Sequence, residues 1–545
     1  MFFGPKNHPV ISHKDILSWI FDEPTYDVDK PVYFDPSNSS RYISHNQAKT
    51  LIRKLVAGFK KAGLEKGDCV NLHSYNDIYY PILFLAIIAS GGVFAGSNPS
   101  YKAFELSHHM KIAKVKFIIS EPQIVGPVLT AAQQNGIPMS NIWIFNEFDP
   151  SLPSNMKSWR SLLDHGEENW VRFDDLQTAK NTPAARFFSS GTTGLPKAAS
   201  LSHYNLVAQH TLVYGTHSRG YEPTRLMSLP NFHIAAAPPT HITALKDGTT
   251  TYIMRRFNLE KFIHHIQIHA ITDIYLVPPI AIAIINSPMV QQSCFSTIRS
   301  ATCGAAPLDK SQQSMLRNKL PAGVPCTQTY GLTEISGAGT TLPYPEDDET
   351  GSIGRLLPGL EAKLVDDKGR EIREYEIPGE LCFRGPTVMN GYFDNPAANK
   401  EAFDQDGWFK TGDLAYCAKE TECWYIVGRK KELIKVRGFQ VAPKEIEGVL
   451  LSHPAVMDVA VIGVKLTNQD DEHPRAYIVK RDGVSSSSLT ENDVKVFAAS
   501  RLAKYKALTG GVRFVDALPR NATGKTLRIA LRERAETEGG QKAHL

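Results

Sequence analysis

The sequence has few of the features that mark zinc-binding, redox, secreted or nucleic-acid-binding proteins. Its 545 residues include seven cysteines, and no two of them form a Cys-x-x-Cys pair. Neither a zinc site nor a redox motif is therefore indicated, and we expect reduced thiols in an intracellular protein. The net charge of +4 is too small to indicate binding to nucleic acid or to an anionic membrane surface.

The chain also lacks an uninterrupted apolar segment of membrane-spanning length. Residues 1–10 have no apolar core of the kind found in signal peptides. The long apolar stretch Ile78–Gly96 contains Pro81 and the pair Gly91-Gly92. A buried helix that leads into a strand is therefore the better interpretation, and no transmembrane segment is expected.

What is present is an alternation of strand and helix patterns over a length that suggests more than one domain. Apolar residues recur on one helical face of Asn46–Lys61, and Gly63 follows as a stop. A strand is predicted at Cys69–His73, then a helix, then a strand near Val93. The alternation continues to Val277, where Pro278-Pro279 begins another helix, and it predicts an α/β fold with much parallel sheet.

The pattern changes in the last third of the chain. From Ile353 to Tyr425, short segments between turns predict a β-rich subdomain. We place a boundary at Gly428–Lys431, giving a large N-terminal domain of α/β sheets (residues 1–427) and a small mobile α+β C-terminal domain (residues 428–545). In the small domain we expect a hairpin over 432–441 and helices over 443–451, 491–502 and 526–536.

The loop Ser189–Lys197 is the most informative segment. Strands are predicted on both sides, at 185–188 and 198–201, and the loop combines two glycines, four hydroxyl side chains and a lysine. Glycines allow close backbone approach, and such donors suit phosphate oxygens. The spacing is not that of a Walker A loop. Taken alone, the loop is also compatible with a polar surface hairpin.

Four further segments follow in order along the chain: Gln328–Glu334, Gly407–Leu414, Gly428–Pro443 and Pro519–Lys525. With the first loop, they resemble the core motifs of the adenylate-forming (AMP-binding) superfamily, especially acyl-CoA ligases of the 4-coumarate-CoA ligase and luciferase branch. The resemblance extends from about Ser44 to Ile529. It implies an ATP-dependent acid:CoA ligase that uses ATP, Mg²⁺ and CoA and acts through an acyl-adenylate.

The resemblance also implies roles for individual residues. Thr333 would bond the α-phosphate, Glu334 would ligate Mg²⁺, and Lys525 would bridge the acyl carboxylate and the α-phosphate as the catalytic cation. Asp413 would bind the ribose, with Arg429 as its cationic partner. The remaining residues expected to contact the nucleotide are Ser189, Ser190, Gly191, Thr192, Thr193, Gly194, Lys197, Gly304, Ala305, Ala306 and Tyr330.

A second group of residues would serve thioester formation. Lys431 occupies the hinge position of the family, and Lys435 and Gln440 match residues that contact the adenylate in one of two conformations. Gly438 would let the pantetheine arm pass close to the backbone. No residue is identified as a base for the thiol.

His233 matches the start of the family's acyl pocket, where amino-acid-activating relatives tend to carry an aspartate. Histidine there favours a simple carboxylic acid. The expected walls, 235–237, 303–304 and 336–339, are small and mostly uncharged. They predict a roomy, apolar pocket for an aryl, arylacetic or medium-chain acid, whereas hydroxycinnamates are disfavoured.

Three alternatives share part of this pattern: an enzyme that loads an acid onto a separate carrier protein, a luciferase-like oxygenase, and a degenerate, non-enzymatic binding protein. The last is disfavoured because Thr333, Glu334, Asp413, Arg429 and Lys525 are all present. The tail Ala543-His544-Leu545 is similar to the peroxisomal address Ser-Lys-Leu. We therefore expect a peroxisomal import receptor as a partner and, failing that, a cytoplasmic protein.

Overall fold

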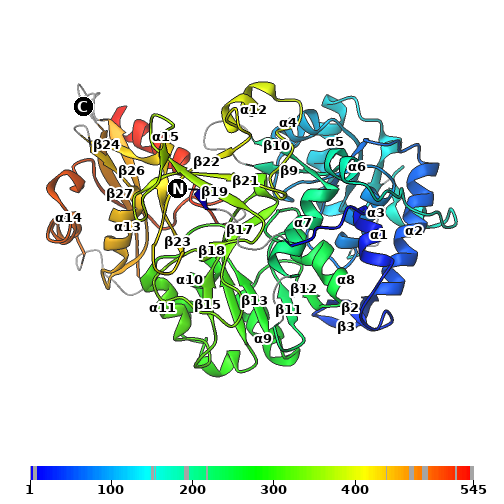
Figure 1. The fold of residues 1–545 in the computed structure, drawn as a ribbon, viewed down its shortest axis with the longest axis horizontal. Helices are drawn as coiled ribbons and strands as arrows, with labels where there is room; N and C mark the ends of the chain where they lie inside the picture. Colours follow the sequence, from blue (N-terminus) through cyan, green and yellow to red (C-terminus); the bar gives the residue numbers. More distant parts are fainter. Residues whose placement is uncertain are drawn as a thin grey trace.

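The computed structural model describes residues 2–3, 9–148, 152–153, 155–189, 196–215, 219–436, 439–465, 472–481, 489–521 and 524–540. In the described part, three large sheets form the body and a smaller three-stranded sheet lies at one end (Figure 1). This is the mixed α/β architecture that the sequence predicts. The boundary at residue 428 stays a prediction.

The first large sheet has strand order β10-β9-β5-β4-β6-β7-β8 and is parallel except for the β9–β10 hairpin. Helices α2 and α3 cover one face and α4 and α5 the other, because alternate strand residues join two separate apolar clusters. All ten residues of α3 are buried, as expected for its apolar sequence. The bounds are β10 Lys197–Ser202, β9 Pro183–Ser189, β5 Val93–Gly96, β4 Cys69–His73, β6 Val115–Ser120, β7 Ile142–Ile144, β8 Lys157–Ser158, α2 His45–Lys61, α3 Tyr80–Ala89, α4 Ala103–Ala113 and α5 Val125–Gln134.

The second large sheet has strand order β15-β14-β13-β11-β12-β2-β3, and only β2 and β3 pair antiparallel. Helices α9, α10 and α11 pack on one face through a second apolar cluster. The other face, which carries Tyr275 and Thr302, lines a cavity. The bounds are β15 Cys326–Gln328, β14 Ser300–Cys303, β13 Asp273–Leu276, β11 Thr224–Met227, β12 Thr250–Ile253, β2 Pro31–Asp35, β3 Asn38–Ser44, α9 Leu259–Ile268, α10 Pro278–Asn286 and α11 Lys310–Arg317.

The third large sheet is antiparallel, which confirms the β-rich prediction for this region. Its order is β1-β19-β21-β22-β23, with β20 beside β19, and a three-stranded sheet, β16-β17-β18, connects it to the second sheet. The bounds are β1 Phe2–Phe3, β19 Glu361–Val365, β20 Glu371–Ile372, β21 Gly379–Arg384, β22 Phe409–Cys417, β23 Trp424–Arg429, β16 Tyr330–Leu332, β17 Gly337–Thr341 and β18 Arg355–Leu356.

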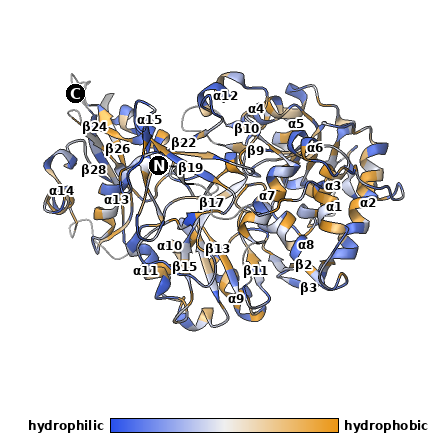
Figure 2. Cartoon of the chain, in the orientation of Figure 1, coloured by the Kyte–Doolittle hydropathy of each residue, from blue (hydrophilic) through white to orange (hydrophobic). Residues whose placement is uncertain are grey.

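The C-terminal part has apolar clusters of its own. Its helix α14 is largely hydrophilic on the outside of the molecule (Figure 2). This helix ends at Ala499, three residues before the predicted end, and α15 begins at Arg528 because Thr526 instead pairs with Arg520. The bounds are β24 Ile434–Val436, β25 Phe439–Val441, α13 Pro443–Leu451, β26 Val456–Lys465, β27 Glu472–Lys480, α14 Glu491–Ala499, β28 Gly511–Phe514 and α15 Arg528–Gly540.

The remaining helices are short, apart from α7, which borders the cavity. Their bounds are α1 Ile16–Phe21, α6 Leu176–Asn181, α7 His203–Val213, α8 Ala244–Asp247 and α12 Pro396–Ala402. In the described part of the chain, no helix has both the length and the apolar character needed to cross a membrane.

Candidate active site

A cavity of about 1600 Å³ lies between the second large sheet, α7, strands β16–β17 and the turn before α15. It begins at the carboxyl ends of β13 and β14, where open α/β sheets usually bind ligands. Its volume exceeds the 300–1,000 Å³ typical of a site for one small molecule. The cavity therefore has room for a nucleotide together with a second substrate.

Asp413 is the centre of a buried polar cluster beside this cavity. The Tyr330 hydroxyl donates to its Oδ2 at 2.7 Å, and Arg429 Nε lies 3.1 Å from its Oδ1. Strands β22 and β23 place Asp413 opposite Arg429. Burial raises the pKa of Asp413, and Arg429 and Tyr330 oppose that shift. Because a carboxylate offers about four lone-pair positions, both oxygens still have room to accept a vicinal diol.

Thr333 and Glu334 follow β16 in a short 3₁₀ turn and line the cavity. The Tyr392 hydroxyl donates to Glu334 Oε1 at 2.8 Å, and Lys197 Nζ lies 5.1 Å from the centre of the Tyr392 ring. Tyr392 thus connects two predicted site residues that are distant in the sequence. It was missed, because an aromatic residue after Asn-Gly gives no chemical signal by itself.

The segment after β14 forms another wall. A Cβ at Gly304 would lie 2.8 Å from Thr329 Cγ2, and Ala305 has a positive φ of 66°, so small residues suit this turn. Gln328 holds the segment, because its side-chain amide bonds both the N–H and the C=O of Leu308. Gly304 and Ala305 line the cavity. Ala306 does not.

Lys525 enters the cavity on the turn between Arg520 and Thr526. Its backbone N–H donates to Asn521 Oδ1 at 2.8 Å. Gly524 has a φ of 81°, and a Cβ there would overlap Pro279 at the start of α10. Burial and the nearby Arg429 lower the pKa of Lys525 to about 8, although Asp413 opposes the shift. This side chain is therefore a partly desolvated cation beside the Asp413 cluster.

A second polar cluster anchors the start of α15. Arg528 Nη1 lies 2.7 Å from Glu432 Oε2, and its Nη2 lies 2.6 Å from Glu447 Oε1. Burial opposes ionisation of Glu447, but Lys444 and Arg528 hold its pKa at about 2. These residues were not among the predicted site residues. The cluster fixes the helix that follows Lys525.

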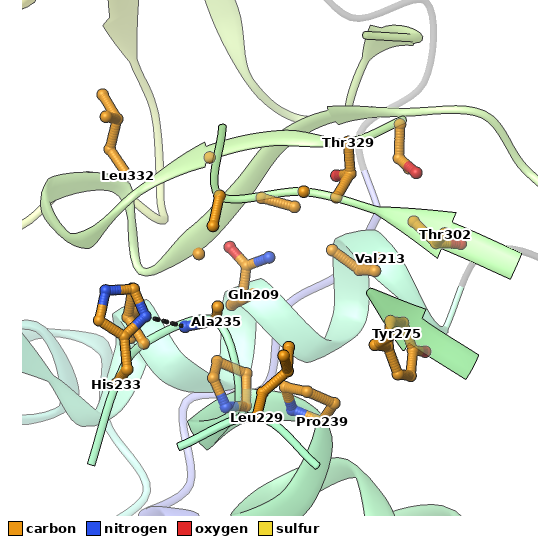
Figure 3. Close-up of a pocket in the computed structure, with 18 of the residues that line it drawn as sticks. Gln209, Val213, Leu229, His233, Ala235, Pro239, Tyr275, Thr302, Thr329 and Leu332 are labelled. Atoms are coloured by element: carbon orange, nitrogen blue, oxygen red, sulfur yellow. Dashed lines mark hydrogen bonds between the residues drawn. The ribbon is translucent and has the colours of Figure 1, made fainter. Parts of the chain in front are cut away.

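His233 lines the cavity before the helical segment that leads to α8 (Figure 3). Its Nδ1 accepts the N–H of Ala235 at 3.1 Å. Burial lowers the pKa of His233 to about 4. At neutral pH the ring is therefore uncharged, and its proton is on Nε2, where it can donate to a ligand.

Several predicted positions are not placed in the cavity. Ser189 lines it, but Ser190–Gly194 and Gly438 lie outside the described residues, as does the side chain of Gln440. Lys197 faces Tyr392 instead. Lys435 is exposed on β24, and its backbone N–H donates to Glu472 Oε2 at 2.8 Å.

The predicted acyl-pocket walls are partly correct. Ala235, Gly304, Gly337 and Ala338 line the cavity, whereas residues 236, 237, 303, 336 and 339 are buried and do not line it. Gln209 of α7 supports this wall. In the amide orientation that satisfies its neighbours, the Gln209 nitrogen donates to the carbonyls of Ile335 and Ala338, both at 3.2 Å, and its oxygen accepts from the Ala338 N–H.

The expected apolar character of the pocket is wrong at one end. Arg219, Arg225 and Asp247 also line the cavity. The signal in the sequence was Arg225 itself. Strands in a parallel sheet are usually apolar on both faces, so a charged residue within one is unusual. Only the pairing of β11 with β13 shows that its side chain shares the face of Asp273 and Tyr275.

Comparison with known families agrees with this geometry. Residues 22–393 match the model of the AMP-binding enzyme family, and residues 445–525 match that of the AMP-binding enzyme C-terminal domain. The chain belongs to the AMP-binding enzyme family. This confirms the resemblance to the adenylate-forming superfamily.

Particular relatives are similar over nearly the full length. Phenylacetyl-CoA ligase epaB of Aspergillus niger is 50% identical over 541 residues, which cover 98% of this chain and 99% of that protein. The crystal structure of ATP-bound MatB from Rhodopseudomonas palustris superposes with a TM-score of 0.84 at 27% identity, covering 96% of this chain and 99% of MatB. Apo MatB gives a TM-score of 0.74 at 26% identity and the same coverage. The conformation of this chain is therefore more similar to that of the ATP-bound form of MatB than to that of the apo form.

Proposed function

We propose that this protein is an ATP-dependent carboxylic acid:CoA ligase. The observation that carries the proposal is the meeting of two parts of the chain in one cavity. Lys525, from the C-terminal part, lines the same cavity as Thr333, Glu334 and His233. The Asp413 cluster lies beside them. The 50% identity to a phenylacetyl-CoA ligase supports the same reaction class and an arylacetic or related acid.

In the first half-reaction, a carboxylate oxygen of the acid attacks the α-phosphorus of ATP. The bond from that phosphorus to the bridging oxygen breaks, and pyrophosphate leaves. Such a step depends on positioning and on stabilising the phosphoryl charge. Asp413 would accept the ribose hydroxyls, Thr333 and Lys525 would donate to the α-phosphate, and His233 Nε2–H would orient the acid.

We assign Mg²⁺ to Glu334. Its carboxylate lines the cavity, and the Tyr392 bond occupies Oε1, which leaves Oε2 for a hard cation. Among the described residues, no group of three or more His, Cys, Asp or Glu side chains is placed to hold a metal ion. One carboxylate together with nucleotide phosphates is a usual Mg²⁺ environment. The ion would supply charge neutralisation at the phosphates.

In the second half-reaction, the thiol of CoA loses its proton to solvent and its sulfur attacks the acyl carbon, the bond from that carbon to the AMP oxygen breaks, and AMP leaves. Lys435 is exposed and outside the cavity in this arrangement. We propose that the small domain, residues 428–545, turns on Lys431 to present residues 435–440 for this step. The exposed side chain of Lys431 is compatible with that role.

A panel of carboxylic acids, scored for pyrophosphate release with and without CoA, tests the proposal. We expect acid-dependent pyrophosphate release, and thioester only when CoA is present. Transfer to a carrier protein but not to CoA would favour the loading enzyme, and light from luciferin and oxygen would favour the oxygenase. The assignment would be overturned if no acid in the panel supported exchange of pyrophosphate into ATP.

We also propose that the protein enters peroxisomes through Ala543-His544-Leu545, which lie outside the described residues. A fluorescent protein ending in residues 541–545 should colocalise with a peroxisomal matrix marker. Diffuse fluorescence would contradict this address.

A further inference from the structure

Arg225 has buried hydrogen-bond donors without partners. The residue lies on β11, is 2% exposed and lines the cavity. Its Nε and Nη1 have no hydrogen-bond partner within the described part of the chain. Burying the donors of a charged group without partners is costly, so such an arrangement calls for an explanation.

The two nearby carboxylates contact other residues. Asp273 forms an ion pair with Arg219 and accepts from Tyr221 at 3.1 Å. Asp247 Oδ1 lies 3.4 Å from His210 Nε2. The Arg225 guanidinium instead lies near two aromatic rings, 5.1 Å from that of Tyr214 and 5.9 Å from that of Tyr275. Because Arg225 lines the cavity and these carboxylates contact other residues, its guanidinium keeps hydrogen-bonding capacity for a molecule in the cavity.

Strand register places Arg225 far from the nucleotide end of the cavity. Arg225 lies opposite Asp273, and Asp273 lies opposite Ser300, four residues before Gly304. At roughly 3.3 Å per residue, the distance along the strand from this level to Gly304 is about 13 Å. In Figure 3, Tyr275 lies across the pocket from His233. Arg225, beside Tyr275, therefore faces the end of the acid that is remote from its reacting carboxylate.

We propose that Arg225 binds an oxygen acceptor, a hydroxyl, carbonyl or second carboxylate, on the remote end of the acid. Acids oxygenated at that end are then preferred over wholly apolar acids of the same length. This inference rests on the proposed ligase activity. A site built to bond an oxygen discriminates against the analogue that lacks it, because its donors are left unpaired.

The test compares matched acids in the full-length enzyme: 4-hydroxyphenylacetate with phenylacetate, and 8-hydroxyoctanoate with octanoate. The measured quantity is the ratio of kcat/KM for acid-dependent pyrophosphate release. We expect the wild type to favour at least one oxygenated acid by about 10-fold or more, as for a hydrogen bond to a charged group. Arg225→Met should bring that ratio close to one by slowing the oxygenated acid, and Arg225→Lys should give an intermediate ratio.

Arg186→Met is the matched control. Arg186 is also buried, at 5% exposed, and its Nε also lacks a partner among the described residues, but the residue is not part of the cavity wall. Its replacement should lower stability and leave the ratio unchanged.

Two results would overturn the role of Arg225. One is a wild-type enzyme with no preference for either oxygenated acid, which decides the question even if neither variant folds. The other is a folded Arg225→Met protein with the wild-type ratio. Failure of the ligase assignment looks different, because then no acid in the panel would release pyrophosphate.

Discussion

The nucleotide end of the cavity and the turn that carries Lys525 are built in different ways. Asp413, Tyr330 and Arg429 lie on strands, and two of them are direct neighbours across β22 and β23. Lys525 lies on a turn whose helix packs on a separate apolar cluster. Gly524 of this turn packs so closely against Pro279 of the body that a Cβ at residue 524 would overlap Pro279. The proposed nucleotide-binding groups therefore lie on paired strands of the body, whereas Lys525, the proposed catalytic cation, lies on a turn of the C-terminal part.

The largest expected effect is that of removing Lys525, the proposed catalytic cation on the C-terminal turn. Lys525→Ala should slow acyl-adenylate formation by roughly 10²–10³, since losing a well-placed charge contact costs about 3–4 kcal/mol. The same variant, supplied with acyl-adenylate and CoA, should still form thioester. Single-turnover measurements of each half-reaction check this. Equal losses in both half-reactions, with the fold intact, would contradict the assignment of Lys525 to adenylation alone.

The next largest effect tests the contact between Gly524 and Pro279, which positions the turn that carries Lys525. Gly524→Ala introduces a Cβ at positive φ and against Pro279, so it should misplace Lys525 and slow adenylation by about 10-fold or more. Gly511→Ala is the control, because Gly511 also has a positive φ, 98°, but its nearest atom to a new Cβ is 3.8 Å away on Arg513. The control should lose about 1 kcal/mol of stability or somewhat more, measured by urea unfolding, with adenylation preserved. Similar adenylation rates in the two variants would show that the contact between Gly524 and Pro279 does not position Lys525.

A change in the fixed wall should depend on the size of the acid. Ala338→Phe fills the cavity beside Gln209, so bulky acids should lose kcat/KM by about 10-fold or more while short acids keep most of it. Gly337 is the poorer position for this test, because its φ of 129° makes any side chain strained. Uniform losses across acids of every size would remove Ala338 from the acyl wall.

The smallest expected effect is a dependence of the adenylation rate on the protonation of Lys525. Lys525 has a pKa of about 8, lowered from 10.5, and only its protonated form stabilises phosphoryl charge. The kcat/KM of adenylation should therefore fall as pH rises through about 8, approaching tenfold per unit above it. Lys525→Ala should lack this basic limb. If Lys525→Ala shows the same fall in kcat/KM at the same pH, another group causes that fall.

Local patterns predicted most elements well. The apolar stripe predicted a helix over Asn46–Lys61, and α2 begins one residue earlier, at His45; β4 matches its predicted range, Cys69–His73. Predictions were weaker at ends that long-range contacts control: α15 begins late because Thr526 pairs with Arg520. The roles of Ser190–Gly194 and Gly438 stay predictions, because these residues lie outside the described part of the chain.

The family, the order of its motifs and the chemical types of the predicted site residues follow from the sequence, because each motif consists of residues adjacent in the chain. Which of these residues meet depends on the fold. Tyr392 reaches Glu334, and Arg225 joins the cavity wall, through packing between distant segments. The periodicity of a strand predicts its two faces, but the sheet and helices packed around it decide which face borders a cavity.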